Sequence, residues 1–128
     1  MAAVELEHVN VTVSDPEAAA RRLCKWFGWK VRWHGPSKDS GITYHVGTDR
    51  SYVALYSAPA PASKGGSSYA TLGGLNHIAV VVDDLEALER TLTADGIKTH
   101  SHANYEPGRR FYFDDPDGIE YEVVSYTA

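Results

Sequence analysis

The sequence predicts an α+β fold built from two tandem βαβββ units, and two observations carry this prediction. The chain repeats itself, because Glu7–Ala19 aligns with Asn76–Leu88 at an offset of 69 with six identities in thirteen positions. Each copy also begins with an alternating apolar segment, continues with a helical pattern and ends in short strand patterns. We therefore expect one domain over residues 1–128, with repeats over residues 4–57 and 74–126 joined by a linker over residues 58–73.

The first copy opens with an expected strand over Leu6–Val13, whose valines alternate with more polar residues and so share one face. Ser14–Glu17 then combines a capping side chain, a proline and an acid, which is typical of a helix N-terminus. This helix is expected to reach Phe27 and to end at Gly28. Three strands should follow, over Lys30–His34, Gly41–Val46 and Tyr52–Tyr56.

The second copy repeats this order. Asp83 or Asp84 is expected to cap a helix that runs to Ala94 and is closed by Gly96. Asp115–Gly118 has the composition of a tight turn and should join the last two strands. The expected strands after the helix are Lys98–His102, Arg110–Phe113 and Glu120–Tyr126.

The composition excludes several functional classes. Hydrophobic residues make up 43% of the chain, which argues against disorder, and the net charge of −5 argues against a nucleic-acid partner. No apolar run approaches the roughly 20 residues of a membrane span, so we expect no membrane partner. The first residues lack the basic and apolar regions of a secretion signal, and Cys24 is the single cysteine. A cytoplasmic location is therefore expected.

Two of the six histidines are selected by the repeat. His8 and His77 hold equivalent positions on the first strands, on the face opposite the valines. On the last strand, Glu120 and Glu122 share one face, and an acid among apolar neighbours needs a positive partner to be buried. Two imidazoles and one carboxylate form a known ligand set for a divalent metal. The alternative is that these histidines only satisfy hydrogen bonds.

At these residues the sequence resembles the vicinal-oxygen-chelate superfamily, which contains glyoxalase I, bleomycin-resistance proteins, fosfomycin-resistance transferases and extradiol dioxygenases. The segments that carry the resemblance contain His8 (EHVNVTV), His77 (NHIAVVVDDLEAL) and Glu122 (FYFDDPDGIEYEV). The resemblance implies a glyoxalase-like fold, with curved mixed sheets around a cleft. It also implies one divalent metal ion per site (Fe, Mn, Ni or Zn) held by those three residues, with Glu122 also acting as the catalytic base.

The resemblance implies a metal-dependent lyase or isomerase for a small molecule chelated through adjacent oxygens. An Fe(II) oxygenase like the extradiol dioxygenases and a metal-free binding protein of the bleomycin-resistance type are the alternatives. Ala54 departs from the glyoxalase I pattern, which has a glutamate ligand there. Small members of the superfamily share sites between chains, so a homodimer is expected, with His8 of one chain joining His77 and Glu122 of the other.

Four further residues are candidates for substrate binding. Tyr44 and Tyr112 align in the repeat and are expected to line the cleft, or else to lie in the core. His100 and His102 are two apart and expected to share a face, with His102 as a candidate proton shuttle and an exposed strand edge as the alternative. Arg109, next to Arg110, is a candidate clamp for an anionic group, or else a solvated cation.

Overall fold

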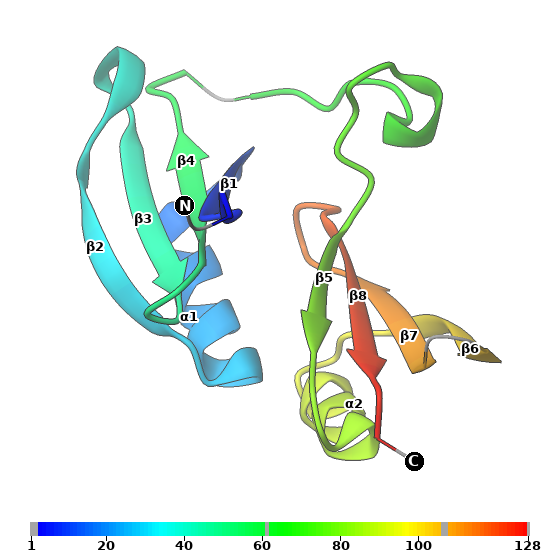
Figure 1. Ribbon diagram of the computed structural model, residues 1–128. Coiled ribbons are helices and arrows are strands. Elements are labelled where there is room, and N and C mark those ends of the chain that lie inside the picture. Colours follow the sequence, from blue (N-terminus) through cyan, green and yellow to red (C-terminus); the bar gives the residue numbers. More distant parts are fainter. Residues whose placement is uncertain (1–2, 61, 106–107, 128) are drawn as a thin grey trace. The chain divides into compact units, whose positions relative to one another are not determined.

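The computed structural model describes residues 3–60, 62–105 and 108–127. They form two compact units over residues 1–63 and 64–128. Each unit has the order strand, helix and three strands, so the predicted α+β fold of two βαβββ repeats is confirmed (Figure 1). The expectation that both repeats share one cleft stays a prediction. No helix in the described part of the chain is long and apolar enough to cross a bilayer.

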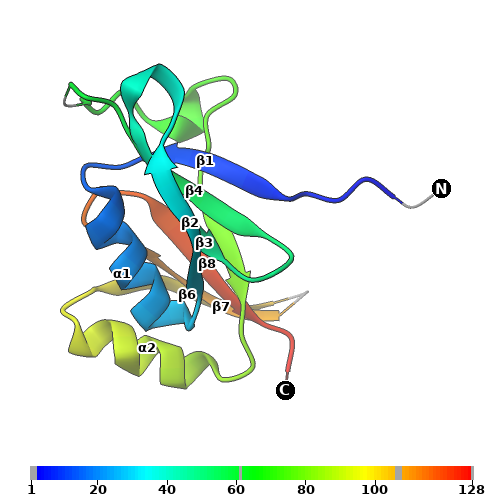
Figure 2. The same ribbon diagram turned by 90° about the vertical axis from the view of Figure 1, so that its left-hand side faces the viewer.

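The first unit is a mixed four-stranded sheet with one helix. Its elements are β1 (His8–Thr12), α1 (Pro16–Phe27), β2 (Lys30–Pro36), β3 (Ile42–Gly47) and β4 (Tyr52–Ser57). The strand order is β1-β4-β3-β2, in which β1 and β4 run parallel and the other neighbours run antiparallel. Figure 2 shows α1 beside this sheet, where Leu23 and Trp26 are buried together with Val53 and Leu55 of β4.

The second unit repeats this topology with β5 (Ile78–Val81), α2 (Leu85–Ala94), β6 (Thr99–Tyr105), β7 (Gly108–Asp114) and β8 (Glu120–Ser125). The order is β5-β8-β7-β6, again with one parallel pair, β5 and β8. Its core is more aromatic than that of the first unit. The fully buried apolar and aromatic side chains among its described residues are Leu92, Phe111, Phe113, Tyr121 and Val123.

The predicted helix caps are confirmed. The Asp15 side chain accepts a hydrogen bond from the Ala18 amide at 3.2 Å, and Asp84 accepts one from the Ala87 amide at 3.0 Å. Gly28 ends α1 in the left-handed region, with φ of 70°, where a side chain would be strained. Sequence patterns therefore located both helices to within a residue or two.

The turn between β7 and β8 is held by Asp115. Its carboxylate accepts hydrogen bonds from the amides of Asp117 and Ile119, both at 2.9 Å, and Gly118 adopts a φ of 82°. This turn fixes the register in which Asp114 lies opposite Glu120. The expected linker contains a short 3₁₀ turn, Ser68–Ala70, within the second unit.

Candidate functional site

The two faces of the second sheet carry different chemistry. Along β7, Phe111 and Phe113 alternate with Arg110, Tyr112 and Asp114. The phenylalanine face is the helix side, since Phe111 stacks on His102, which binds α2. The opposite face carries Glu120 and Glu122 of β8, and Glu122 is paired in register with both Ala79 and Tyr112. We call this opposite face the acidic face of the second unit.

Glu122 is a buried carboxylate that contacts an arginine and a histidine. Its Oε2 accepts a hydrogen bond from Arg110 Nη1 at 2.7 Å, and its Oε1 lies 3.0 Å from His77 Nε2. The side chains of Glu122 and Arg110 are only 9% and 10% exposed. A buried carboxylate is tolerated when a well-placed cation compensates for its lost hydration. Arg110 is therefore the positive partner that the burial of an acid on this strand requires.

Arg110 is itself held in place by its neighbours. Its Nε and Nη2 donate to the Gly108 carbonyl at 3.3 and 3.1 Å, and its guanidinium lies over the Tyr105 ring at 4.6 Å. Four contacts thus fix one guanidinium, which leaves it little freedom to follow a ligand. The sequence indicated the arginine pair but not this role for Arg110.

His77 lies between two carboxylates. Its Nε2 faces Glu122, and its Nδ1 lies 3.8 Å from Glu120 Oε1, beyond hydrogen-bond distance. Nδ1 is buried and has no hydrogen-bond partner within the described ranges. Tyr112 packs its ring edge-on against the imidazole at 5.5 Å. Burial, and then the charge of Glu122, raises the pKa of the Tyr112 hydroxyl, so Tyr112 stays a neutral neighbour at physiological pH.

His8 lies in an aromatic group on the first sheet. Its Nδ1 lies 2.8 Å from Glu7 Oε1, and its ring stacks on Tyr52 at 4.7 Å. His45, to which the sequence assigned no role, stacks on Tyr52 at 4.4 Å, and Trp33 lies against His45 at 4.9 Å. The hydrogen bond from His8 lowers the pKa of Glu7. With Nδ1 facing Glu7, Nε2 is the nitrogen of His8 that remains for a metal.

Ala54 lies on the same side of the first sheet as His8 and is only 1% exposed. In register it is paired with Asn10 on one side and His45 on the other. An alanine side chain has no donor atom and cannot ligate a metal. A ligand set in this chain would therefore lack a donor from β4.

The donor geometry of the second unit fits a divalent metal. Two ligands about 2.1 Å from one ion and at right angles to each other are about 3.0 Å apart. His77 Nε2 and Glu122 Oε1 have this separation. Arg110 occupies the other oxygen of Glu122, so the carboxylate would bind through one oxygen. Glu7 and Glu120 lie beside the Nδ1 atoms of His8 and His77, the position of carboxylates that orient metal-binding histidines.

Tyr44 and Tyr112 are not equivalent, and the alignment of the third strands of the repeat was wrong by one residue. Tyr112 is paired in register with Glu122, whereas Tyr44 is paired with Leu55. A shift of one residue moves a side chain to the other face of a sheet. Tyr44 accordingly directs its hydroxyl toward Glu17 of α1, at 3.4 Å. The residue that occupies the place of Tyr112 in the first unit is His45.

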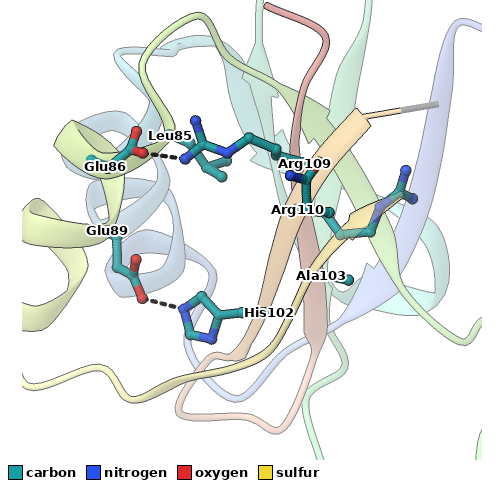
Figure 3. A pocket seen from close by; sticks show the side chains of 8 residues that line it. Leu85, Glu86, Glu89, His102, Ala103, Arg109 and Arg110 are labelled. Atoms are coloured by element: carbon teal, nitrogen blue, oxygen red, sulfur yellow. Dashed lines mark hydrogen bonds and ion pairs between the residues drawn. The ribbon is translucent and has the colours of Figure 1, made fainter. Parts of the chain in front are cut away.

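His102 and Arg109 lie on the helix side of the second sheet, in a pocket of about 360 Å³ between α2 and strands β6 and β7 (Figure 3). His102 Nε2 lies 2.6 Å from Glu89 Oε2, and Arg109 pairs with Glu86. Figure 3 shows Arg109 reaching toward α2 while Arg110 points the other way. The two predicted substrate residues thus connect α2 to the sheet and lie apart from His77 and Glu122.

The prediction that His100 and His102 share a face was wrong. The register of β6 shifts between His100 and Ala103, and Ser101 has a φ of 57°. This bulge turns His102 toward α2, whereas His100 stays on the acidic face, stacked on Tyr112 at 6.3 Å. Strand alternation alone cannot reveal such a bulge.

The fold and this site define a class of small proteins with two βαβββ repeats, each with a histidine at its first strand. A family model described as "Glyoxalase/Bleomycin resistance protein/Dioxygenase superfamily" matches residues 5–123. The chain belongs to this superfamily. No curated protein sequence matches the chain significantly.

Solved structures share the fold at low sequence identity. A glyoxylase/bleomycin resistance protein/dioxygenase domain from Frankia sp. EAN1pec has a TM-score of 0.81 and 20% identity, covering 97% of this chain and 93% of that one. The fosfomycin resistance protein FosX from Listeria monocytogenes gives 0.74 and 16%, covering 98% and 96%. TnmS3, an antibiotic-binding protein from Streptomyces sp. CB03234, gives 0.73 and 22%, covering 99% of each.

Proposed function

We propose that the protein is a divalent-metal-dependent lyase or isomerase that acts on a small molecule chelated through adjacent oxygens. The observation that carries this proposal is the pair formed by His77 Nε2 and Glu122 Oε1, 3.0 Å apart on the acidic face. Within the superfamily, a FosX structure was solved with Mn(II) and a dihydroxypropylphosphonic acid, which supports metal-dependent chemistry on this fold. Fe, Mn, Ni and Zn are all compatible with these donors.

In this proposal His8, His77 and Glu122 hold the metal. When bound, the metal would act as a Lewis acid that stabilises negative charge developing on a chelated oxygen. Arg110 fixes Glu122 through Oε2, so Oε1 is the oxygen that would hold the metal and, on leaving it transiently, would accept and return the substrate proton. His77 is held against Tyr112, and the hydroxyl of Tyr112 stays protonated because its pKa is raised. Tyr112 thus keeps one protonation state, and Arg110 keeps Glu122 in one orientation.

We also propose that the protein is a homodimer in which His8 of one chain completes the ligand set of the other. This proposal rests on how the proposed metal ligands are distributed between the two units. His8 belongs to the first unit, whereas His77 and Glu122 belong to the second. Light scattering coupled to size-exclusion chromatography should give twice the mass of 14.0 kDa. A stable monomer that still binds metal would contradict it. A cytoplasmic location remains part of the proposal.

The first test is metal content and affinity. Untagged wild-type protein should bind Mn²⁺ or Zn²⁺ in a calorimetric titration, and His77→Ala and Glu122→Gln should each weaken binding at least tenfold. Asp83→Asn removes an equal charge from an exposed site in the same unit and should bind as the wild type does. Equal binding by His77→Ala and wild type would refute the ligand assignment. The loaded protein should then be screened with α-ketoaldehyde–thiol adducts, epoxides and catechols.

A metal-free binding function is the second candidate, and one observation favours it. The face of the first sheet that carries His8 is aromatic. On this face Trp33 is 47% exposed, and the alanine at position 54 is buried. Such a surface suits stacking by a flat ligand, and the fold neighbour TnmS3 is described as an antibiotic-binding protein. A protein that binds no metal but quenches Trp33 fluorescence with an aromatic ligand would support this candidate. Turnover of catechols would instead support an Fe(II) oxygenase.

A further inference from the structure

A second group of potential metal ligands lies on the acidic face. His100, Asp114 and Glu120 each offer one ligand atom, and these three atoms all lie within 4.8 Å of one another. They come from three adjacent strands, β6, β7 and β8. We call this group the β6–β8 cluster. It contains neither His77 nor Glu122.

Register places the two carboxylates of the cluster directly against each other. Asp114 and Glu120 are paired across β7 and β8, on either side of the Asp115 turn. Two like charges in directly opposed positions destabilise a sheet unless a cation lies between them. Within the described ranges, Asp114 forms its ion pair with His100, and no lysine or arginine side chain pairs with its carboxylate. The positions therefore favour a bound positive charge.

His100 directs its Nε2 toward this pair. Its Nδ1 lies 2.8 Å from Ser101 Oγ, so in the neutral ring this atom can carry the proton and donate it to the hydroxyl. Nε2 is then a lone pair 3.5 Å from Asp114 Oδ2. Nε2 is buried and has no hydrogen-bond partner among the residues that the structure describes. A lone pair that faces acceptor-only carboxylates is satisfied by a cation.

Glu120 is fixed from its other side. The Tyr69 hydroxyl donates a hydrogen bond to Glu120 Oε1, and this bond raises the pKa of Tyr69 to about 12. The hydroxyl therefore remains a donor at any physiological pH. The same oxygen lies 3.8 Å from His77 Nδ1, so Glu120 connects the β6–β8 cluster to the His77–Glu122 pair.

We propose that His100, Asp114 and Glu120 form a second divalent-cation site, distinct from the site at His77 and Glu122. One imidazole and two carboxylates suit Mn²⁺ or Zn²⁺, and exposure of Asp114 to solvent leaves room for water to complete the coordination. Because Glu120 Oε1 also lies 3.8 Å from His77 Nδ1, a cation in the cluster would draw this carboxylate away from the histidine. Occupation of the two sites should therefore be linked.

The test isolates the cluster by first disabling the other site. In a His77→Ala/Glu122→Gln background, untagged protein is titrated with Mn²⁺ and free ion is followed by electron paramagnetic resonance. We expect about one Mn²⁺ per chain to remain bound, and Asp114→Asn or His100→Gln in that background to weaken binding at least tenfold. Asp83→Asn in the same background is the matched charge control. Circular dichroism checks that each variant is folded.

Two results would overturn the proposal. The background variant binding no Mn²⁺ would show that the cluster is only an ion pair with a protonated imidazole. Binding that survives both Asp114→Asn and His100→Gln would place the ion elsewhere. A second measurement uses the same background variant, in which added Mn²⁺ should broaden the NMR signals of His100 and Asp114. Failure of the proposed function can be told apart from failure of this second site. It would appear as equal metal binding by wild-type protein and by the His77→Ala/Glu122→Gln variant.

Discussion

Replacing Arg110 by methionine tests the electrostatic basis of the site. The change removes the guanidinium that binds Glu122 Oε2 at 2.7 Å and keeps much of the side-chain volume. Removing one partner of a buried ion pair costs about 3–5 kcal/mol, because the other charge stays buried. His77 Nε2 remains 3.0 Å from the other oxygen, so Glu122 keeps one polar neighbour. We therefore expect a loss of about 2–4 kcal/mol.

The neighbouring arginine is a matched control. Arg109 pairs with Glu86, but these side chains are 37% and 55% exposed, and exposed pairs contribute about 0–1 kcal/mol. Arg109→Met should therefore cost less than about 1 kcal/mol. Urea unfolding of both variants, followed by circular dichroism, measures the difference in the loss of unfolding free energy between two adjacent residues on opposite faces of one strand.

A double-mutant cycle completes this test. Glu122→Gln alone should destabilise the protein, but in the Arg110→Met background it should cost much less or even stabilise, because the uncompensated charge is then removed. We expect a coupling energy of at least about 1 kcal/mol between the two positions, within the range measured for residues in contact. Additive effects, with a coupling below about 0.5 kcal/mol, would refute the argument that Arg110 compensates for the burial of Glu122.

Three further predictions concern stability. Asp84→Ala removes the cap on the Ala87 amide and should cost about 1 kcal/mol in thermal unfolding, whereas no loss would refute the cap. Gly47→Ala places a Cβ 2.3 Å from the Ser51 carbonyl oxygen. The change should therefore destabilise the protein by more than about 2 kcal/mol in urea unfolding. Wild-type stability of this variant would contradict the close approach. Burial, helped by nearby positive charges, lowers the pKa of His45 in the folded state. The contribution of His45 to stability is therefore complete above the unfolded pKa of about 6.5, and it falls as the pH drops toward the folded pKa. In that pH window, the unfolding curves of His45→Gln should depend less on pH than those of wild type.

Sequence patterns were sufficient for the order of the elements, because caps, glycines and alternation are local signals. They failed where register decides which face a side chain occupies. The repeat alignment at Tyr44 and Tyr112 was displaced by one residue, which put Tyr44 on the wrong face. The bulge at Ser101 separated His100 from His102 for the same reason, since a single extra residue reverses the alternation.

The candidate site was also predictable only in part, because local signals identified some of its residues. The spacing of the repeat singled out His77, and alternation put Glu122 on one face with Glu120. Arg110 was missed as the partner of Glu122, although it lies two residues before Tyr112 on a strand and so shares its face. The β6–β8 cluster was missed because it depends on pairing across three strands, which one sequence does not display.

The central claim is that His77 and Glu122 are metal ligands. The most direct test is the Mn²⁺ affinity of untagged wild-type protein, compared with Glu122→Gln and with the charge control Asp83→Asn in one calorimetric titration. We expect wild-type affinity for the control and at least a tenfold loss of affinity at the first site for Glu122→Gln. Identical binding curves for all three proteins would contradict it.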